Sequence, residues 1–269
     1  MKQRVITGIL AAILFLGLLT VGGIGFTLLI LLLALIGFFE FVRLNQIAPF
    51  SASAIFGYIS VAYIVIPWQL YDWSHFSNFQ IVWITMFIFL TITVVSKNRV
   101  HIEHAAMLTL GVFYVGIGFH YMLLTRLAPE QWGDSGLYWS LLIFVCIWLT
   151  DIGAYFSGMA FGKRLLWPSI SPKKTIEGAL GGLTLSIAAA LLFAWYSPDR
   201  LELVEALWIG LAAGVVGQLG DFIQSAYKRV RGAKDSGILL PGHGGVLDRC
   251  DSWIIVFPFV HMVQLLPFT

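Results

Sequence analysis

The stretch from Asp221 to Asp251 holds most of the chemistry-bearing side chains of this chain, and apolar segments lie on both sides of it. Four aspartates and five basic residues fall within it: Asp221, Asp235, Asp248, Asp251, Lys228, Arg229, Arg231, Lys234 and Arg249. Ionised groups next to long apolar segments are costly, and function is the usual reason to keep them. Carboxylates and cations in this mixture suit a metal ion and phosphate groups.

The spacing of the aspartates predicts a shared site. Asp221 and Ser225 are four residues apart and lie on one helix face, and Asp248 and Asp251 are three apart. Carboxylates that converge from two helix ends favour Mg²⁺, which binds a few carboxylates together with substrate phosphates. The alternative is that each aspartate pairs with a nearby cation, for instance Asp248 with Lys228. We favour a metal site made by Asp221, Asp248 and Asp251.

A glycine-rich run, PGHGG, lies between these aspartates and includes His243, Gly244 and Gly245. Glycines allow backbone N–H groups to approach an anion closely. Lys234, Arg229 and Arg249 add positive charge that suits phosphate. The run does not have the G-x-x-x-x-G-K-[ST] pattern of a P-loop. His243 could donate to a phosphate or transfer a proton, and a histidine without function in a turn explains it equally well.

A second polar cluster lies between residues 148 and 182. Asp151 falls inside an apolar segment, where a cation or a place in the metal or substrate site would offset its cost. The run SPKKT, from Ser171 through Lys173 and Lys174, precedes another apolar segment. A helix N-terminus beside two lysines favours an anion. The alternative is that these lysines anchor the topology or contact anionic lipids.

The composition indicates that lipid surrounds most of the chain. Hydrophobic residues make up 59% and charged residues 11%, and the mean hydropathy is +0.87. Soluble domains have about 25% charged residues. We therefore predict an all-α polytopic integral membrane protein of about nine transmembrane helices. The apolar runs cover residues 5–20, 25–41, 50–68, 79–95, 104–124, 136–158, 175–196, 203–226 and 252–268.

The basic residues predict the orientation of these helices. With a cytoplasmic N-terminus, fourteen of the 16 Lys and Arg residues lie on the cytoplasmic side, and Arg126 and Arg200 lie opposite. The first run has the basic start of a signal peptide, but no small-residue cleavage site follows, so we favour a first membrane helix. Both polar clusters then face the cytoplasm.

The polar clusters also divide the chain into two parts. We expect residues 1–130 to form a helical scaffold, in which Glu40 is one of few ionisable groups, and residues 131–269 to carry the catalytic site. Glycines at positions 178, 181, 182, 210, 214 and 217 suit close helix packing. The two cysteines, Cys146 and Cys250, have neither the spacing of a zinc site nor that of a disulfide framework.

The motifs resemble the signature of the CDP-diacylglycerol synthases, or phosphatidate cytidylyltransferases. The similar residues are S-x-x-K-R-x4-K-D from Ser225 and P-G-H-G-G-x-x-D-R-x-D up to Asp251. D-x-x-A-Y from Asp151 and S-P-K-K-T-x-E-G from Ser171 also look like this family. Gln224 stands where many members have Glu, and Cys250 where an aliphatic residue is usual. The resemblance covers most of residues 148–254.

The resemblance implies an enzyme that transfers the cytidylyl group of CTP to phosphatidic acid, giving CDP-diacylglycerol and pyrophosphate. It implies Mg²⁺, with room for a second cation, at Asp221, Asp248 and Asp251, with Lys228 and Arg249 as further catalytic groups. The expected substrate-binding residues are Asp151, Ser171, Lys173, Lys174, Ser225, Arg229, Lys234, His243, Gly244 and Gly245. The expected partners are CTP, phosphatidic acid, membrane lipids and a second copy of the chain, without nucleic acid, at a bacterial inner membrane.

Two other functions remain open at this point. An ion- or proton-coupled transporter would use Asp151 and Asp221 as intramembrane sites, but the sequence has no clear inverted repeat. A CTP-dependent lipid kinase would need the same metal and phosphate groups. The D-G-x-x-A-R pattern of the CDP-alcohol phosphotransferases is absent.

Overall fold

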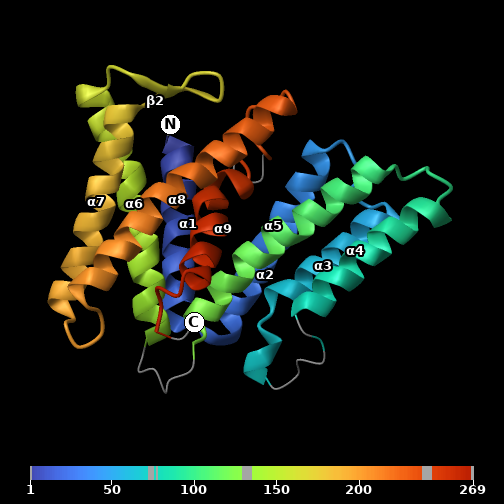
Figure 1. The fold of residues 1–269 in the computed structure, drawn as a ribbon, viewed down its shortest axis with the longest axis horizontal. Coiled ribbons are helices and arrows are strands. Elements are labelled where there is room, and N and C mark those ends of the chain that lie inside the picture. Colours follow the sequence, from blue (N-terminus) through green and yellow to red (C-terminus); the bar gives the residue numbers. More distant parts are fainter. Residues whose placement is uncertain (1, 72–75, 77, 129–134, 238–243, 268–269) are drawn as a thin grey trace. The chain divides into compact units, whose positions relative to one another are not determined.

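A computed structural model of the chain describes residues 2–71, 76, 78–128, 135–237 and 244–267. Within these ranges, nine α-helices carry the fold (Figure 1). They are α1 (Lys2–Val21), α2 (Gly23–Leu44), α3 (Ala52–Val65), α4 (Asn78–Val95), α5 (Ile102–Arg126), α6 (Ser135–Phe161), α7 (Ile176–Tyr196), α8 (Leu203–Val230) and α9 (Leu247–Met262). A 3-10 turn, η1 (Trp68–Tyr71), follows α3.

These helices confirm the prediction of an all-α integral membrane protein. Five of the described helices are long and apolar enough to cross a bilayer: α2, α5, α6, α7 and α8. Shorter apolar helices occupy 7–21, 52–65 and 79–95. A helix needs about 20 apolar residues to span the hydrocarbon core. Large side chains such as Leu192 and Trp208 are exposed, as a lipid environment requires.

Three boundaries differ from the prediction in ways that affect the polar clusters. Helix α8 continues to Val230, so Lys228 and Arg229 lie on its last turn. Helix α9 begins at Leu247, so Asp248 and Asp251 lie within it and not before it. Residues expected as a loop form a short antiparallel hairpin of β1 (Leu165–Trp167) and β2 (Ser171–Thr175). The pairing of Trp167 with Ser171 closes this hairpin.

The chain forms two compact units. The first comprises residues 1–127 and 235–247, and the second comprises 128–234 and 248–269. The sequence divided the chain after residue 130 and assigned the whole glycine-rich segment to the C-terminal part. In the structure the described ends of that segment belong to the first unit, because Ser236 and Leu247 bond to Glu40 on α2.

The first unit packs helix α5 against α2, α3 and α4 (Figure 1). Phe38, Phe119 and Leu108 are fully buried in its core. The guanidinium of Arg126 donates to the backbone oxygens of Leu19 and Thr20, so it binds the last carbonyl groups of α1. This unit supplies most of the scaffold that the sequence predicted.

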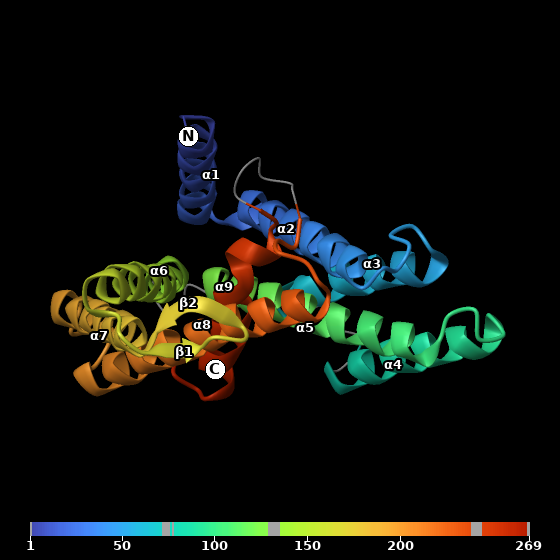
Figure 2. The same cartoon turned by 90° about the horizontal axis from the view of Figure 1, so that it is seen from above.

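The second unit packs α7 against both α6 and α8, and the hairpin lies across the same ends of these three helices (Figure 2). Glycines permit the close approach: a Cβ on Gly182 would lie 2.5 Å from the Thr150 carbonyl oxygen of α6. The predicted packing role is confirmed for Gly178, Gly181, Gly182, Gly210, Gly214 and Gly217, each of which faces a neighbouring helix. Helix α9 meets α8 where Ser252 donates to the Gly217 carbonyl, at 2.9 Å.

Candidate active site

A cavity of about 460 Å³ lies in the second unit, where the hairpin meets the ends of the helices. This volume suits a small-molecule site. Residues of α6, the hairpin, α7 and α8 form its wall: Asp151, Ala154, Tyr155, Gly158, Met159, Leu166, Lys173, Lys174, Thr175, Gly178, Ala179, Gln218 and Asp221. The cavity therefore joins the predicted second cluster, from Asp151 to Glu177, to the start of the first.

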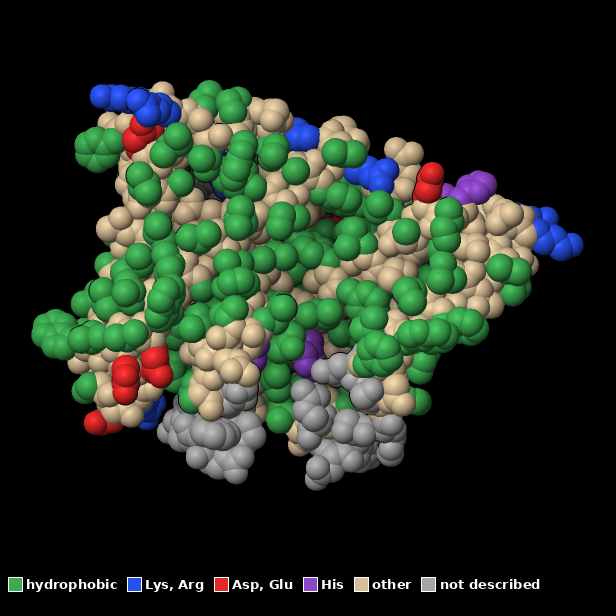
Figure 3. Space-filling view, in the orientation of Figure 1, with side chains coloured by type: hydrophobic (Ala, Val, Ile, Leu, Met, Phe, Trp, Pro, Cys, Tyr) green, Lys and Arg blue, Asp and Glu red, His purple; other side chains and the backbone are tan. Residues whose placement is uncertain are grey.

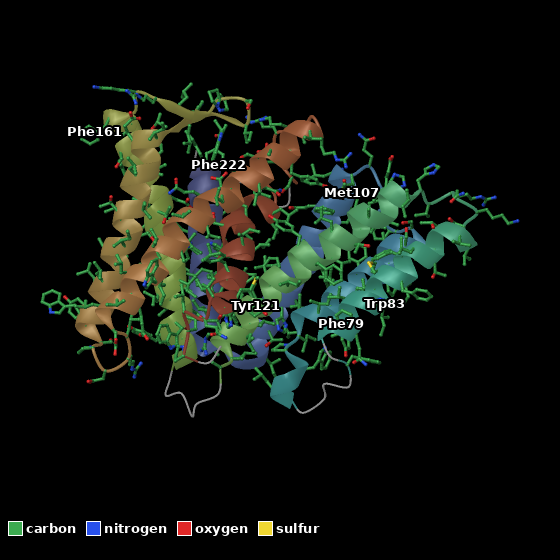
Figure 4. The ribbon with its side chains drawn as sticks, in the orientation of Figure 1. Phe79, Trp83, Met107, Tyr121, Phe161 and Phe222 are labelled. Atoms are coloured by element: carbon green, nitrogen blue, oxygen red, sulfur yellow. The ribbon has the colours of Figure 1, made fainter. Side chains whose placement is uncertain are left out.

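Lys174 is the central cation of this cavity. Its ammonium group pairs with the Asp221 carboxylate and lies 4.5 Å from the centre of the Phe222 ring. The ring of Phe222 also meets Trp167 of the hairpin edge to face, with the ring centres 4.8 Å apart. In Figure 4, Phe222 lies on α8 directly beneath the hairpin. These contacts hold β2, and with it Lys174, over α8.

Asp221 also confirms the predicted side-by-side arrangement with Ser225. The Ser225 hydroxyl donates to Asp221 Oδ1 at 3.3 Å, one helical turn away. One oxygen of Asp221 thus accepts from α8 itself and the other accepts from Lys174. The carboxylate is oriented from two sides before any substrate binds.

Three carboxylates interact electrostatically with Lys174. Asp151, Asp221 and Asp251 repel one another electrostatically, and Lys174 attracts each of them. Asp251 reaches this group because α8 and α9 are in close contact: a Cβ on Gly220 would lie 2.6 Å from the Asp251 carbonyl oxygen. Arg249 adds a second positive field at Asp151. Two cations, Lys174 and Arg249, thus act on this group of carboxylates.

Asp248 has a cationic partner of its own. It pairs with Lys228 of α8 at 2.5 Å, and the two side chains are 7% and 14% exposed. This is the ion pair that the sequence offered as the alternative to metal binding. In the described ranges, no three His, Cys, Asp or Glu side chains are already gathered around a point that could hold a metal ion. The three aspartates predicted as ligands are thus held by different partners.

The start of α7, which was predicted as an anion site, is capped by the chain itself. Thr175 caps the helix by accepting from the Gly178 N–H at 3.1 Å, and the lysines before it lie on a strand. The Glu177 carboxylate accepts from the backbone N–H groups of Lys163 and Arg164 at 3.0 and 3.2 Å. Glu177 therefore holds the base of the hairpin. Turn-forming Pro168, directly after β1, was the available signal for this hairpin in the sequence.

The other predicted site residues have more varied positions. Arg229 donates to the Ile170 carbonyl oxygen in the hairpin turn at 3.3 Å, which places it near Ser171. Lys173 lines the cavity, while Lys234 and Arg249 are exposed. His243 lies outside the described residues. Gly244 and Gly245 belong to the first unit, where Gly245 packs against Ser236 and Glu40.

The donor set of the cavity fits a divalent cation. Carboxylate oxygens are the ligands that Mg²⁺ prefers, and Asp151 and Asp221 line a cavity large enough for waters and phosphates. Asp251 is close enough to interact electrostatically with both of them. Lys174 interacts with all three carboxylates, and Arg249 interacts with Asp151. A divalent cation at this place would find carboxylate oxygens on α6, α8 and α9.

Sequence reasoning missed one polar group altogether. Glu40 was assigned to a scaffold of no chemical interest, yet its buried carboxylate binds residues of both described ends of the glycine-rich segment. A carboxylate near the end of an apolar helix was the available signal, because such a group needs a partner. The identity of that partner could not be read from the spacing.

Comparison with known proteins agrees with this arrangement of motifs. A model of the cytidylyltransferase family matches residues 2–266. The chain belongs to the cytidylyltransferase family. A phosphatidate cytidylyltransferase of Staphylococcus haemolyticus is 40% identical over 265 residues, covering 98% of this chain and 99% of the relative. One from Bacillus subtilis is 38% identical over 268 residues, covering 99% and 98%.

Membership of the cytidylyltransferase family extends over the whole chain and not just the polar clusters. The relative from Staphylococcus aureus strain COL, also a phosphatidate cytidylyltransferase, is 38% identical over 265 residues. The matched region includes α1 to α5, which carry none of the motifs that resemble the family. The family match therefore covers both units.

Proposed function

We propose that this protein transfers the cytidylyl group of CTP to phosphatidic acid, releasing pyrophosphate and forming CDP-diacylglycerol. The observation that carries the proposal is the cavity in which Asp151, Asp221, Lys173 and Lys174 meet. This cavity has both charged and apolar walls and lies at the end of three apolar helices, where a lipid headgroup and a soluble nucleotide can both reach it. The names of the relatives agree with the same reaction.

The reaction requires the protein to position the two substrates and to stabilise the charge on their phosphates. An oxygen of the lipid phosphate attacks the α-phosphorus of CTP, the bond to the bridging oxygen breaks, and pyrophosphate leaves. The attacking phosphate is already anionic, so no general base is needed. Fixed positive groups stabilise the charge that develops on the phosphate oxygens. Lys173, Lys174, Lys228, Arg229, Lys234 and Arg249 are the candidates.

The two ion pairs suit this task. Lys174 and Lys228 are each held by a carboxylate, Asp221 and Asp248, so both ammonium groups are pre-positioned. A substrate phosphate offers the same anionic oxygen that the carboxylates offer now. Lys174 can therefore exchange Asp221 for a phosphate without moving far from the Phe222 ring.

We further propose that Mg²⁺, with room for a second cation, binds in this cavity. Asp221 and Asp251 would hold it, with Asp151 beside them, and Asp248 would join after leaving Lys228. The cation would neutralise the phosphate oxygens during the transfer. The carboxylate cluster around Lys174 supports this assignment because carboxylate oxygens are the ligands that Mg²⁺ prefers.

The proposed site faces the cytoplasm of a bacterial inner membrane, from which CTP is supplied. The distribution of charge in the second unit supports this side. Asp199 lies between α7 and α8, Glu202 caps α8 and Glu205 lies in its first turn. Lys163, Arg164 and Lys173 lie at the opposite end of these helices, in and beside the hairpin. Basic residues concentrate on the cytoplasmic side of membrane proteins. Apolar side chains cover the helices between these two ends (Figure 3).

A double-label assay tests the reaction directly. Purified protein in detergent receives Mg²⁺ and phosphatidic acid with CTP labelled at either the α- or the γ-phosphorus. Cytidylyl transfer puts the α-label in the lipid product and the γ-label in pyrophosphate. A CTP-dependent lipid kinase would put the γ-label in lipid when diacylglycerol is supplied. Absence of α-labelled lipid with intact, folded protein would refute the proposal.

A further inference from the structure

The carboxylate of Glu40 on α2 is buried, with 3% of the residue exposed, and its donors include two backbone N–H groups and one hydroxyl. The Val246 N–H donates to Oε1 at 2.9 Å, and the Leu247 N–H donates to Oε2 at 2.9 Å. The Ser236 hydroxyl donates to Oε2, also at 2.9 Å. One carboxylate thus binds residues on both sides of the glycine-rich segment, about ten positions apart in the chain.

Two glycines make room for this carboxylate. A Cβ on Gly237 would lie 2.3 Å from Glu40 Oε1, and a Cβ on Gly245 would lie 2.4 Å from Oε2. Gly245 was expected to bring backbone close to a phosphate. In the structure the anion that its backbone approaches is Glu40. The absence of side chains at positions 237 and 245 is therefore explained by contact within the first unit.

The N–H groups that Glu40 binds lie at the start of α9. The first N–H groups of a helix have no acceptor inside the helix, and a negative charge is stabilising there. Leu247, the first residue of α9, is fully buried. One of its methyl groups would lie 3.2 Å from a Cβ on Gly37, and Gly37 lies on α2 one turn before Glu40. Helix α9 is therefore fixed at its first residue by both a charge and an apolar contact.

We propose that Glu40 is a positioning residue for the cytidylyl transfer. It fixes the start of α9, and the first turns of that helix carry Asp248, Arg249 and Asp251. The inference rests on the proposed function for its catalytic consequence. Its structural part, that Glu40 holds the start of α9 in place, stands independently and has a readout of its own.

Cys250 provides that readout, because it lies in the first turn of α9 and is 2% exposed. Cys146 lies on α6, is fully buried, and reports on general loosening. The chain has two cysteines, so both can be followed in the same sample. The full-length protein in detergent is treated with N-ethylmaleimide, and the modification of each cysteine is measured by peptide mass spectrometry over time.

Glu40→Gln replaces one acceptor oxygen by an NH₂ group, so either Val246 or Leu247 loses its bond. We expect Cys250 to react about tenfold faster in this variant, since the start of α9 opens locally, while Cys146 stays protected. The kcat for cytidylyl transfer should fall about tenfold to a hundredfold, because small displacements of catalytic groups are costly. The KM for phosphatidic acid should stay within about twofold of the wild-type value, since the misplaced groups act at the transition state.

Glu103→Gln is the matched control, because Glu103 is an exposed carboxylate in the first turn of α5. It should leave labelling and kcat unchanged. Ser236→Ala removes the hydroxyl donor to Glu40 and should give a smaller change in the same direction. If Glu40→Gln does not fold, the Cys250 labelling and the kcat of Ser236→Ala test the proposal instead.

The proposal is overturned if Cys250 stays as protected in the variants as in the wild type, or if both cysteines become reactive together. It is also overturned if labelling changes while kcat does not. A wild-type protein that lacks cytidylyl transfer would instead refute the proposed function, and the labelling of Cys250 would still report whether Glu40 holds α9.

Discussion

The ion pair between Lys228 and Asp248 allows the effect of charge balance on stability to be separated from the effect of the two side chains on catalysis. The two side chains are 14% and 7% exposed, so each charge depends on the other. Asp248→Asn removes the negative charge with almost no change in shape. Removing one partner of a buried pair costs about 3 kcal/mol or more, because the other charge is left uncompensated. For a chain of this size that cost corresponds to roughly 6 to 12 °C in Tm.

The double variant Lys228→Met/Asp248→Asn removes both charges. Its stability should return to within about 1 kcal/mol of the wild type, since no unpaired charge stays buried. Its activity should not return. Both groups are proposed to act on the cation or the phosphates, so turnover should stay at least about a hundredfold below the wild type.

The assay combines thermal unfolding in detergent with transfer of α-labelled CTP to lipid. Asp199→Asn is the control, because Asp199 is an exposed carboxylate in the connection between α7 and α8. The reasoning about the ion pair fails if Asp248→Asn unfolds at the wild-type temperature. The catalytic assignment fails if the double variant recovers turnover, because neither charge would then be needed.

Three further outcomes are expected. Lys174→Met should lower the kcat of the lipid-transfer assay by about a hundredfold, while Lys173→Met, which removes an exposed cation, should lower it less. Equal effects of the two variants would contradict the central role of Lys174. Chelation of divalent cations with EDTA should abolish transfer and added Mg²⁺ should restore it, and activity that persists after complete chelation would contradict the proposed cation. Gly182→Ala should lower the free energy of unfolding by about 1–3 kcal/mol, because its Cβ would lie 2.5 Å from the Thr150 carbonyl oxygen. Gly17→Ala is its control, since no atom lies within 4 Å of that Cβ, and equal stability of the two variants would contradict the packing argument.

Periodicity and composition of the sequence predicted the helices of this protein and several of their contacts. Apolar runs predicted nine helices because each run must cover a hydrocarbon core, and nine α-helices occur among the described residues. Helical spacing also predicted the contact between Ser225 and Asp221, and small residues predicted the close helix contacts of α7 and α8. These features are local in the chain, so periodicity is sufficient to reveal them.

The pairing of charges was decided by tertiary structure alone. The sequence offered Asp248 either as a metal ligand or as the partner of Lys228, and the structure shows the ion pair. The sequence grouped Asp248 with Asp221 and Asp251, whereas the electrostatic group in the structure contains Asp151 in its place. Such choices depend on how far α8 extends and where α9 begins, and helix ends are the least predictable features of a sequence.

The hairpin and Glu40 illustrate the same limit. Lys174 reaches Asp221 because β2 folds back across α8 and the Phe222 ring supports it, and neither contact follows from residue spacing. Glu40 lies about 200 residues before the N–H groups that it binds, so no local pattern joins them. The sequence thus determined which residue types could bind cations and phosphates. The packing of distant segments decided which carboxylate serves the cavity, which one pairs with a lysine, and which one holds the start of α9.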